Sequence, residues 1–178
     1  MKPKEEKKKD LLYERKNFWK EARQEEVKKA MAFAKPYKDF LNEAKTERES
    51  VRIFEKMLRD SKFLALPCGR GNTRVYSIFR NKTIAIAVIG KLPLSEGFNM
   101  VASHIDAPRV DLKQNPLYTD KNSSMACMRT HYYGGIKKYQ WVSTPLALHG
   151  IVVKNDGRVM DVCIGEKDSE PVFIIPDL

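Results

Sequence analysis

The sequence has 178 residues, of which 33 are lysine or arginine and 23 are aspartate or glutamate, so its formal net charge is +10. This length suits one domain, or one and a fraction, with enough chain to bury a substantial core. Because no apolar run approaches the roughly 20 residues that cross a bilayer, and no hydrophobic segment follows the lysine-rich start MKPKEEKKKD, we expect a soluble cytoplasmic protein without a membrane partner.

The first part of the chain has the periodicity of helices. Apolar residues recur at intervals of three and four positions between Leu11 and Ala34, and this spacing predicts a helix that Pro36 interrupts. A second helix is predicted to start near Pro36 and to carry Phe40 and Leu41.

A third helix is predicted over about residues 47–60. Thr46 and Glu49 have the spacing of a capping box, in which each side chain satisfies a free backbone N–H at the start of a helix. The amphipathic run VRIFEKML follows this pair and supplies the apolar face of the helix.

The positive charge admits nucleic acid as an alternative partner, because basic side chains attract phosphate. Lys137, Lys138, Tyr139 and Trp141 form a basic and aromatic patch of the kind that binds single strands. Much of the charge, however, lies in the first sixty residues, where lysine and arginine alternate with glutamate at helical spacing. That interleaving is typical of a solvated helix face and favours a protein without a nucleic-acid partner.

Short runs rich in β-branched and aromatic residues replace the helical pattern from Phe63 onward. FLALP, RVYSIF, TIAIAVIG and FNMVASHI are predicted strands separated by turn-forming residues. The last two are apolar enough for central strands that are buried on both faces. The sequence therefore predicts an α/β fold in which N-terminal helices lead into a helix-covered mixed sheet.

Further strand candidates follow Asp111, namely MACMRTHYY, PLALHGIVV, GRVMDVCI and PVFII. Asn155-Asp156-Gly157 predicts a hairpin turn between two of them. Pro108 and Pro116 should interrupt strand pairing between the two sets of strands. The three cysteines belong to no Cys-x-x-Cys pair and are predicted to be reduced thiols.

The stretch MVASHIDAPRVDL, residues 100–112, carries the candidate site. His104 ends a predicted strand, and open α/β sheets bind ligands beyond their strand ends. Asp106 can accept the second N–H of the imidazole and orient the ring toward a metal ion. The alternative is a structural buried histidine beside a turn aspartate. Zinc needs three or four ligands, and His131 and His149 stand at no recognisable ligand spacing, so these residues leave both interpretations open.

Four blocks follow one another along the chain: SHIDAPRVDLKQNPLY, HYYGGIKKYQW, PLALHGIVVKNDG and PVFIIPDL. In this order they resemble the aspartyl aminopeptidase and aminopeptidase I family of zinc metallopeptidases, in its bacterial probable aminopeptidase 1 branch. The resemblance covers nearly the whole chain. It implies a cytosolic exopeptidase with two metal ions that releases N-terminal residues from peptide substrates.

The resemblance also implies roles for individual residues. His104 would bind one zinc ion, Asp106 would be the catalytic-site residue that orients its imidazole, and Lys138 would be a candidate substrate contact. Residues 1–108 would form the N-terminal part of a catalytic α/β domain. Residues 109–178 would form a β-rich inserted oligomerisation domain, incomplete here, that assembles into a large homo-oligomeric ring or cage.

The family's metal-bridging aspartate, glutamate pair, further acidic ligand and second histidine find no counterpart in these 178 residues. Dinuclear hydrolysis needs both metals and a carboxylate that moves the proton. The resemblance therefore predicts a fragment that lacks most of the metal site and is inactive alone. The alternative is an inactive assembly module that joins full-length subunits.

Overall fold

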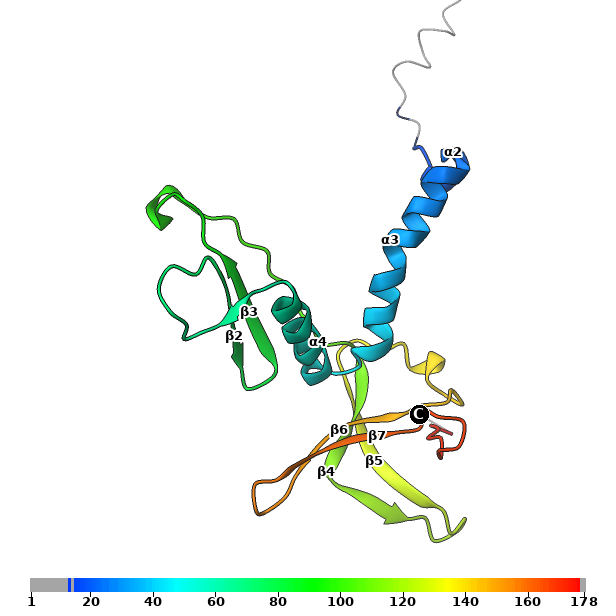
Figure 1. The fold of residues 1–178 in the computed structure, drawn as a ribbon. Coiled ribbons are helices and arrows are strands. Elements are labelled where there is room, and N and C mark those ends of the chain that lie inside the picture. The colour runs from blue at the N-terminus through cyan, green and yellow to red at the C-terminus, as the bar shows by residue number, and fades with distance from the viewer. Residues whose placement is uncertain (1–12, 14, 177–178) are drawn as a thin grey trace, which may run out of the picture. The chain divides into compact units, whose positions relative to one another are not determined.

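The computed structural model describes residue 13 and residues 15–176, so the predicted helix positions Leu11 and Leu12 lie outside the described residues. The chain divides into two compact units, Met1–Asn42 and Glu43–Leu178, and each is considered by itself (Figure 1). No helix within the described ranges is long and apolar enough to cross a membrane.

The first unit is helical, but its break lies elsewhere than predicted. Helix α2 spans Phe18–Glu21, and helix α3 runs without interruption over Gln24–Glu43 with Pro36 inside it. The predicted interruption at Pro36 is therefore wrong. Proline removes one N–H from the helix and leaves the carbonyl four residues earlier without its usual partner. That carbonyl belongs to Ala32, an exposed residue, so water can satisfy it and the helix continues.

The second unit opens with helix α4 over Glu47–Asp60, as predicted. Both hydrogen bonds of the capping box are present: the Glu49 N–H donates to Thr46 Oγ1 at 3.3 Å, and the Thr46 N–H donates to Glu49 Oε2 at 2.8 Å. Buried apolar side chains come from this helix and from strand β2, namely Val51, Leu58, Val75 and Tyr76.

Strand β2, Arg74–Phe79, lies at the centre of a three-stranded sheet. Strand β1, Leu64–Ala65, pairs with it in parallel, and strand β3, Thr83–Val88, pairs with it in antiparallel orientation. Helix α4 lies against this sheet (Figure 1). The Tyr76 hydroxyl contacts Glu55 and Arg59 of the helix. The prediction of an α/β fold with a helix-covered mixed sheet is confirmed.

The predicted strand FNMVASHI does not form. Residues 97–108 have no regular secondary structure between the short 3₁₀ helix η1, Leu94–Glu96, and strand β4. Val101 is 98% exposed, and Val88 of β3 is 69% exposed, so the expectation of burial on both faces is also wrong. A strand requires a neighbouring backbone for its N–H and C=O groups, and within the described residues no strand pairs with this segment.

The remaining strands form two antiparallel pairs. Strand β4, Arg109–Thr119, pairs with β5, Ala126–Tyr133, and β6, Leu148–Val153, pairs with β7, Val159–Ile164. The β6–β7 hairpin turns at Asn155-Asp156-Gly157 as predicted, with Gly157 at a φ of 82°. The predicted strand PVFII does not form as a continuous strand. It contributes isolated β-bridges at Phe173 and Ile175.

Strand β4 was not predicted, because prolines were expected to stop pairing there. It starts directly after Pro108 and runs through Pro116. The register of the β4–β5 pair shifts between Leu112 and Leu117, so Pro116 lies in an irregular stretch where no regular ladder bond is required of it. The three cysteines are free thiols, in agreement with the sequence.

Candidate functional site

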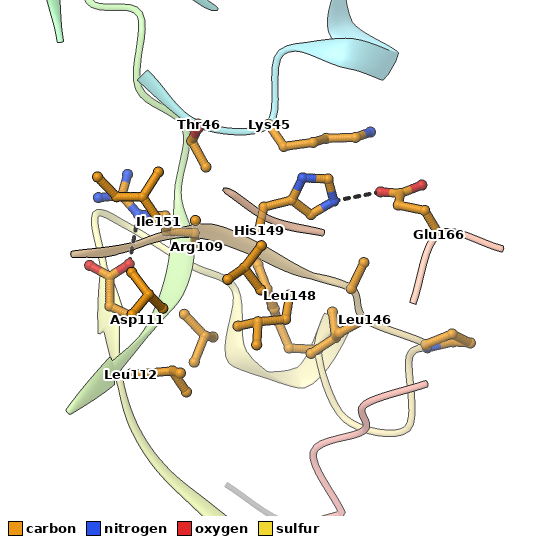
Figure 2. Close-up of a pocket in the computed structure, with 17 residues that line it drawn as sticks. Lys45, Thr46, Arg109, Asp111, Leu112, Leu146, Leu148, His149, Ile151 and Glu166 are labelled. Atoms are coloured by element: carbon orange, nitrogen blue, oxygen red, sulfur yellow. Dashed lines mark hydrogen bonds and ion pairs between the residues drawn. The ribbon is translucent and has the colours of Figure 1, made fainter. Parts of the chain in front are cut away.

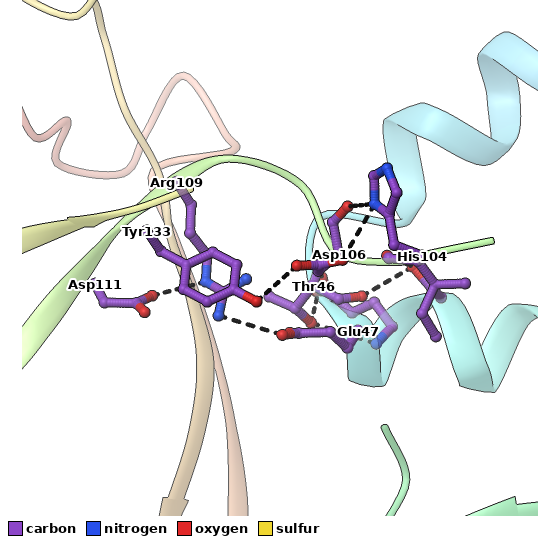
Figure 3. A network of polar contacts seen from close by, with 10 residues as sticks. Thr46, Glu47, His104, Asp106, Arg109, Asp111 and Tyr133 are labelled. Atoms are coloured by element: carbon purple, nitrogen blue, oxygen red, sulfur yellow. Dashed lines mark hydrogen bonds and ion pairs between the residues drawn. The ribbon is translucent and has the colours of Figure 1, made fainter. Parts of the chain in front are cut away.

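His104 and Asp106 contact each other as the sequence predicts. Nδ1 of His104 lies 2.8 Å from the backbone oxygen of Asp106 and 3.1 Å from its Oδ1 (Figure 3). Both partners are acceptors, so Nδ1 carries the hydrogen and the neutral ring keeps its lone pair on Nε2. The alternative of a buried structural histidine is wrong, because the His104 side chain is 82% exposed.

The second carboxylate oxygen of Asp106 is held by a residue distant in the sequence. The Tyr133 hydroxyl, at the end of strand β5, donates a hydrogen bond of 2.7 Å to Asp106 Oδ2 (Figure 3). This bond lowers the pKa of the Asp106 carboxyl and raises the pKa of the Tyr133 phenol. Asp106 is therefore an ionised carboxylate that accepts from Tyr133 on one oxygen and from His104 on the other.

Arg109 connects this pair to helix α4. Its Nε donates to Asp111 Oδ1 at 2.7 Å, and its Nη2 lies 3.2 Å from Glu47 Oε1 in the first turn of α4. The guanidinium carbon also lies 4.1 Å from the centroid of the Tyr133 ring, within the range of a cation–π contact. Arg109 and Tyr133 are direct partners in the β4–β5 ladder, which explains the stacking.

His104, Asp106 and Tyr133 line a pocket of about 320 Å³. Its lining comes from the first turn of α4, the start of β3, the segment around His104 and the end of β5: Glu47, Lys82, Thr83, Ile84, Ser103, His104, Ile105, Asp106 and Tyr133. One imidazole nitrogen with an orienting carboxylate can supply a single metal ligand and its support. Across residues 13 and 15–176, no three His, Cys, Asp or Glu side chains gather in a group that could hold a metal ion.

The other candidate residues of the sequence lie outside this pocket. His131 is paired with Asp111 in the β4–β5 ladder, and its Nδ1 is 3.3 Å from the backbone oxygen of Tyr132. Lys138 lies in the short 3₁₀ helix η2, Lys138–Gln140, with its Nζ 4.8 Å from the centroid of the Tyr132 ring. Its role as a substrate contact stays a prediction.

The basic and aromatic patch is not one open surface. Tyr139 is 75% exposed, whereas Trp141 is half-buried and lines a separate pocket of about 510 Å³. The absence of a nucleic-acid partner stays a prediction.

The larger pocket contains His149, which the sequence left without an assigned role (Figure 2). Nδ1 of His149 lies 2.8 Å from Glu49 Oε1, and its Nε2 lies 2.8 Å from Glu166 Oε1. Burial by itself lowers the pKa of His149, but the hydrogen bonds to the two carboxylates outweigh burial and raise that pKa above its ordinary value. Through these two carboxylate contacts, His149 joins the start of α4 to strand β6 and to the segment after β7.

We expect the free energy of unfolding to depend on pH through His149. Because its pKa is raised in the folded chain, its stabilising contribution is complete below the unfolded value of about 6.5 and is lost as pH rises through the folded pKa. Urea unfolding across this range should show stability falling more steeply in the unmodified chain than in His149→Gln. Glu166→Gln should give an intermediate slope, because one acceptor remains. Parallel pH profiles for all three proteins would contradict this assignment.

The contact of His104 with Asp106 could be predicted from the sequence, but the residues that hold this pair could not. Tyr133 lies within the block HYYGGIKKYQW, and Arg109 lies within SHIDAPRVDLKQNPLY, so both blocks mark the region. No spacing rule, however, links positions 27 residues apart, as Tyr133 and Asp106 are. Only the pairing of β4 with β5 brings the tyrosine to the aspartate.

Comparisons with known proteins agree on one family. The model of the aminopeptidase I zinc metalloproteases (M18) matches residues 40–178. The chain is 44% identical over 176 residues to a probable M18 family aminopeptidase 1 of Clostridium acetobutylicum, covering 95% of this chain and 37% of that protein.

Solved structures are similar as well. The crystal structure of the M18 aminopeptidase from Thermotoga maritima matches with a TM-score of 0.80 and 44% identity, over 94% of this chain and 36% of that one. The dodecamer of yeast aminopeptidase 1 matches with a TM-score of 0.66 and 23% identity, over 82% of this chain and 36% of that one, which shows a shared fold alone. The chain thus spans little more than a third of the length of the relatives it matches.

Proposed function

The chain belongs to the aminopeptidase I zinc metalloprotease family, M18, and on that premise we propose that it supplies the first part of a metallo-aminopeptidase that releases N-terminal residues from peptides. The observation that carries the proposal is the His104–Asp106 contact. It gives an exposed imidazole a hydrogen on Nδ1 and a lone pair on Nε2, which is the form that ligates zinc.

The donor set suits one zinc ligand. Within the described residues, no hydrogen bond joins His104 Nε2 to another group, so this nitrogen is open to a metal ion. Zinc bound there would activate water and polarise the peptide carbonyl. Asp106, kept ionised by Tyr133, holds the imidazole in place and strengthens it as a ligand.

The further ligands of a site with two zinc ions are proposed to come from outside residues 1–178. Two observations support this: the described residues gather no group of three ligating side chains, and the chain spans 37% of the length of its Clostridium relative. In this proposal, residues 1–108 are the start of the catalytic domain, and residues 109–178 are part of an inserted β-rich oligomerisation domain. The 178-residue chain is then inactive by itself.

A second candidate function is assembly, in which the chain joins full-length copies without turnover of its own. The exposed apolar segment before His104 favours this candidate, since Phe98, Met100 and Val101 are 72%, 75% and 98% exposed. Exposed apolar side chains next to unpaired backbone recruit other chains. We also propose that the chain forms homo-oligomers. The yeast aminopeptidase 1 structure that shares its fold is a dodecamer, which supports this proposal.

One experiment tests both candidates. The purified chain and a full-length aminopeptidase that contains it would be assayed with Leu-, Asp- and Glu-p-nitroanilide in the presence of zinc, manganese or cobalt, and each preparation would be sedimented. We expect chelator-sensitive turnover from the full-length protein and none from the chain, which should sediment as an oligomer. Chelator-sensitive hydrolysis by a monomeric 178-residue chain would overturn the proposal that the site is completed elsewhere. If the full-length protein releases no amino acid but binds the chain, the assembly function replaces the enzymatic one.

A further inference from the structure

We infer that Tyr133 is a positioning residue: its hydroxyl holds the Asp106 carboxylate in the orientation in which Asp106 orients the imidazole of His104. The inference rests on the proposed function, in which His104 is a metal ligand, and extends it to a residue of the β4–β5 pair. The Tyr133 hydroxyl donates to Asp106, and Asp106 in turn contacts the imidazole, so Tyr133 acts on His104 through Asp106 (Figure 3).

The Asp106 carboxylate is held on both of its oxygens. The terminal torsion of an aspartate side chain is broad, so a carboxylate with one partner turns easily. Asp106 has a partner on each oxygen, with His104 at 3.1 Å from Oδ1 and the Tyr133 hydroxyl at 2.7 Å from Oδ2. Because the Tyr133 hydroxyl holds one oxygen, the carboxylate keeps its other oxygen turned toward the imidazole, whose Nδ1 also lies 2.8 Å from the Asp106 backbone oxygen.

The Tyr133 ring is held in place by Arg109. Tyr133 ends strand β5, where it is paired across the ladder with Arg109, whose guanidinium carbon is 4.1 Å from the ring centroid. Arg109 is itself held by Asp111 at 2.7 Å and by Glu47 at 3.2 Å. A tyrosine stacked under an arginine with two carboxylate partners has little freedom to turn away from Asp106.

The backbone after Tyr133 supports the same placement. Gly134 has a φ of 73°, a conformation that residues with a side chain rarely adopt, and it lies beside Pro108. The chain therefore turns immediately after Tyr133 and leaves the ring at the end of the strand, next to the segment that carries Asp106. Tyr133 of the block HYYGGIKKYQW thus meets Asp106 of the block SHIDAPRVDLKQNPLY, and the two blocks contribute to one site.

Tyr133 and Asp106 come from the two different predicted domains. Asp106 and His104 lie in residues 1–108, whereas Tyr133 lies in residues 109–178, the predicted inserted domain. A displacement of the β4–β5 pair would loosen the carboxylate and, through it, the imidazole. The inserted strands then contribute to ligand geometry as well as to assembly.

The test is the tautomer of His104, which a purely structural tyrosine would not affect. The chain has three histidines, so the two ring nitrogens of each can be resolved by long-range nitrogen–proton NMR of the ¹⁵N-labelled chain, recorded above the ordinary imidazole pKa of about 6.5. We expect His104 in the unmodified chain to carry its hydrogen on Nδ1. Tyr133→Phe should shift it partly toward the mixture of tautomers found in a free histidine side chain, because the Asp106 backbone oxygen still accepts from Nδ1 at 2.8 Å. Far-ultraviolet circular dichroism should be unchanged.

A matched control is available on the same strand. Tyr132→Phe removes a hydroxyl from the neighbouring residue, which is 58% exposed and does not contact Asp106, so the His104 tautomer should stay on Nδ1. Zinc chloride titrated into each protein and followed on the His104 ring signals gives a second readout. Tyr133→Phe should weaken this binding by about tenfold, the lower end of the range for residues that support a ligand, and Tyr132→Phe should not.

Two reference variants separate this inference from the proposed function. If Asp106→Asn releases the Nδ1 tautomer while Tyr133→Phe leaves both the tautomer and zinc binding as in the unmodified chain, Tyr133 has no positioning role and the inference is overturned. If His104→Ala binds zinc as well as the unmodified chain does, the ligand assignment itself fails, whatever Tyr133→Phe does to the tautomer. Should Tyr133→Phe fail to fold, Arg109→Lys, which keeps a cation but loses the stacked planar group, takes its place and is expected to release the tautomer partly.

Discussion

Replacing His104 by alanine should remove the metal ion from one of the two proposed sites and abolish nearly all peptidase turnover in a full-length aminopeptidase that contains these residues. In the proposed site His104 offers the ligating nitrogen, and the described residues hold no group of three or more His, Cys, Asp or Glu side chains that could take over from it. We expect turnover to fall by more than about 100-fold, beyond the usual effect of losing a residue that only supports a ligand. Zinc content per subunit and p-nitroanilide hydrolysis measure the two effects.

The control for this variant is His131→Ala. His131 is an exposed strand residue that does not line the pocket around His104, so its loss should leave zinc content and turnover unchanged. Full zinc occupancy together with normal turnover in His104→Ala would end the ligand assignment.

Replacing Asp106 by asparagine should have a smaller but still large effect on the same enzyme. The amide has nearly the same shape, but it lacks the negative charge, and only its one oxygen can accept a hydrogen bond. The amide oxygen can therefore replace only one of the two carboxylate oxygens, which lie 3.1 Å from His104 Nδ1 and 2.7 Å from the Tyr133 hydroxyl. We expect zinc affinity and turnover to fall by about 10 to 100-fold.

Zinc dissociation constants from competition with a chelating dye would measure this effect. Asp120→Asn provides the control, because Asp120 accepts hydrogen bonds from Ser123 in a turn and does not line the pocket around His104. If Asp106→Asn bound zinc and turned over substrate as the Asp120 variant does, the support role of Asp106 would be wrong.

Features that involve neighbouring residues could be predicted from the sequence. The capping box of Thr46 and Glu49 and the bounds of helix α4 follow from groups three residues apart. The contact between His104 and Asp106 follows in the same way, because two residues can meet across one bend without help from the rest of the fold. The β6–β7 hairpin likewise depends on a turn at Gly157, where glycine permits a positive φ.

Features that depend on a distant partner were missed or predicted wrongly. The run FNMVASHI has the composition of a buried strand, yet a strand exists only when another backbone pairs with it, and composition does not supply that backbone. Pro116 was expected to end pairing, but the bulged register opposite β5 accommodates it.

The same distinction applies within the candidate site. Glu49 was predicted as a helix cap, and its Oε2 has that role, but its Oε1 receives His149 from a strand 100 residues away. His104 and Asp106 lie two positions apart, and so their contact could be predicted from the sequence alone, whereas their role as proposed ligand and support came from the family resemblance. The tertiary structure decided that Tyr133, Arg109 and Glu47 hold that pair, because the pairing of β4 with β5 and the contact of Arg109 with helix α4 join residues that no local spacing connects.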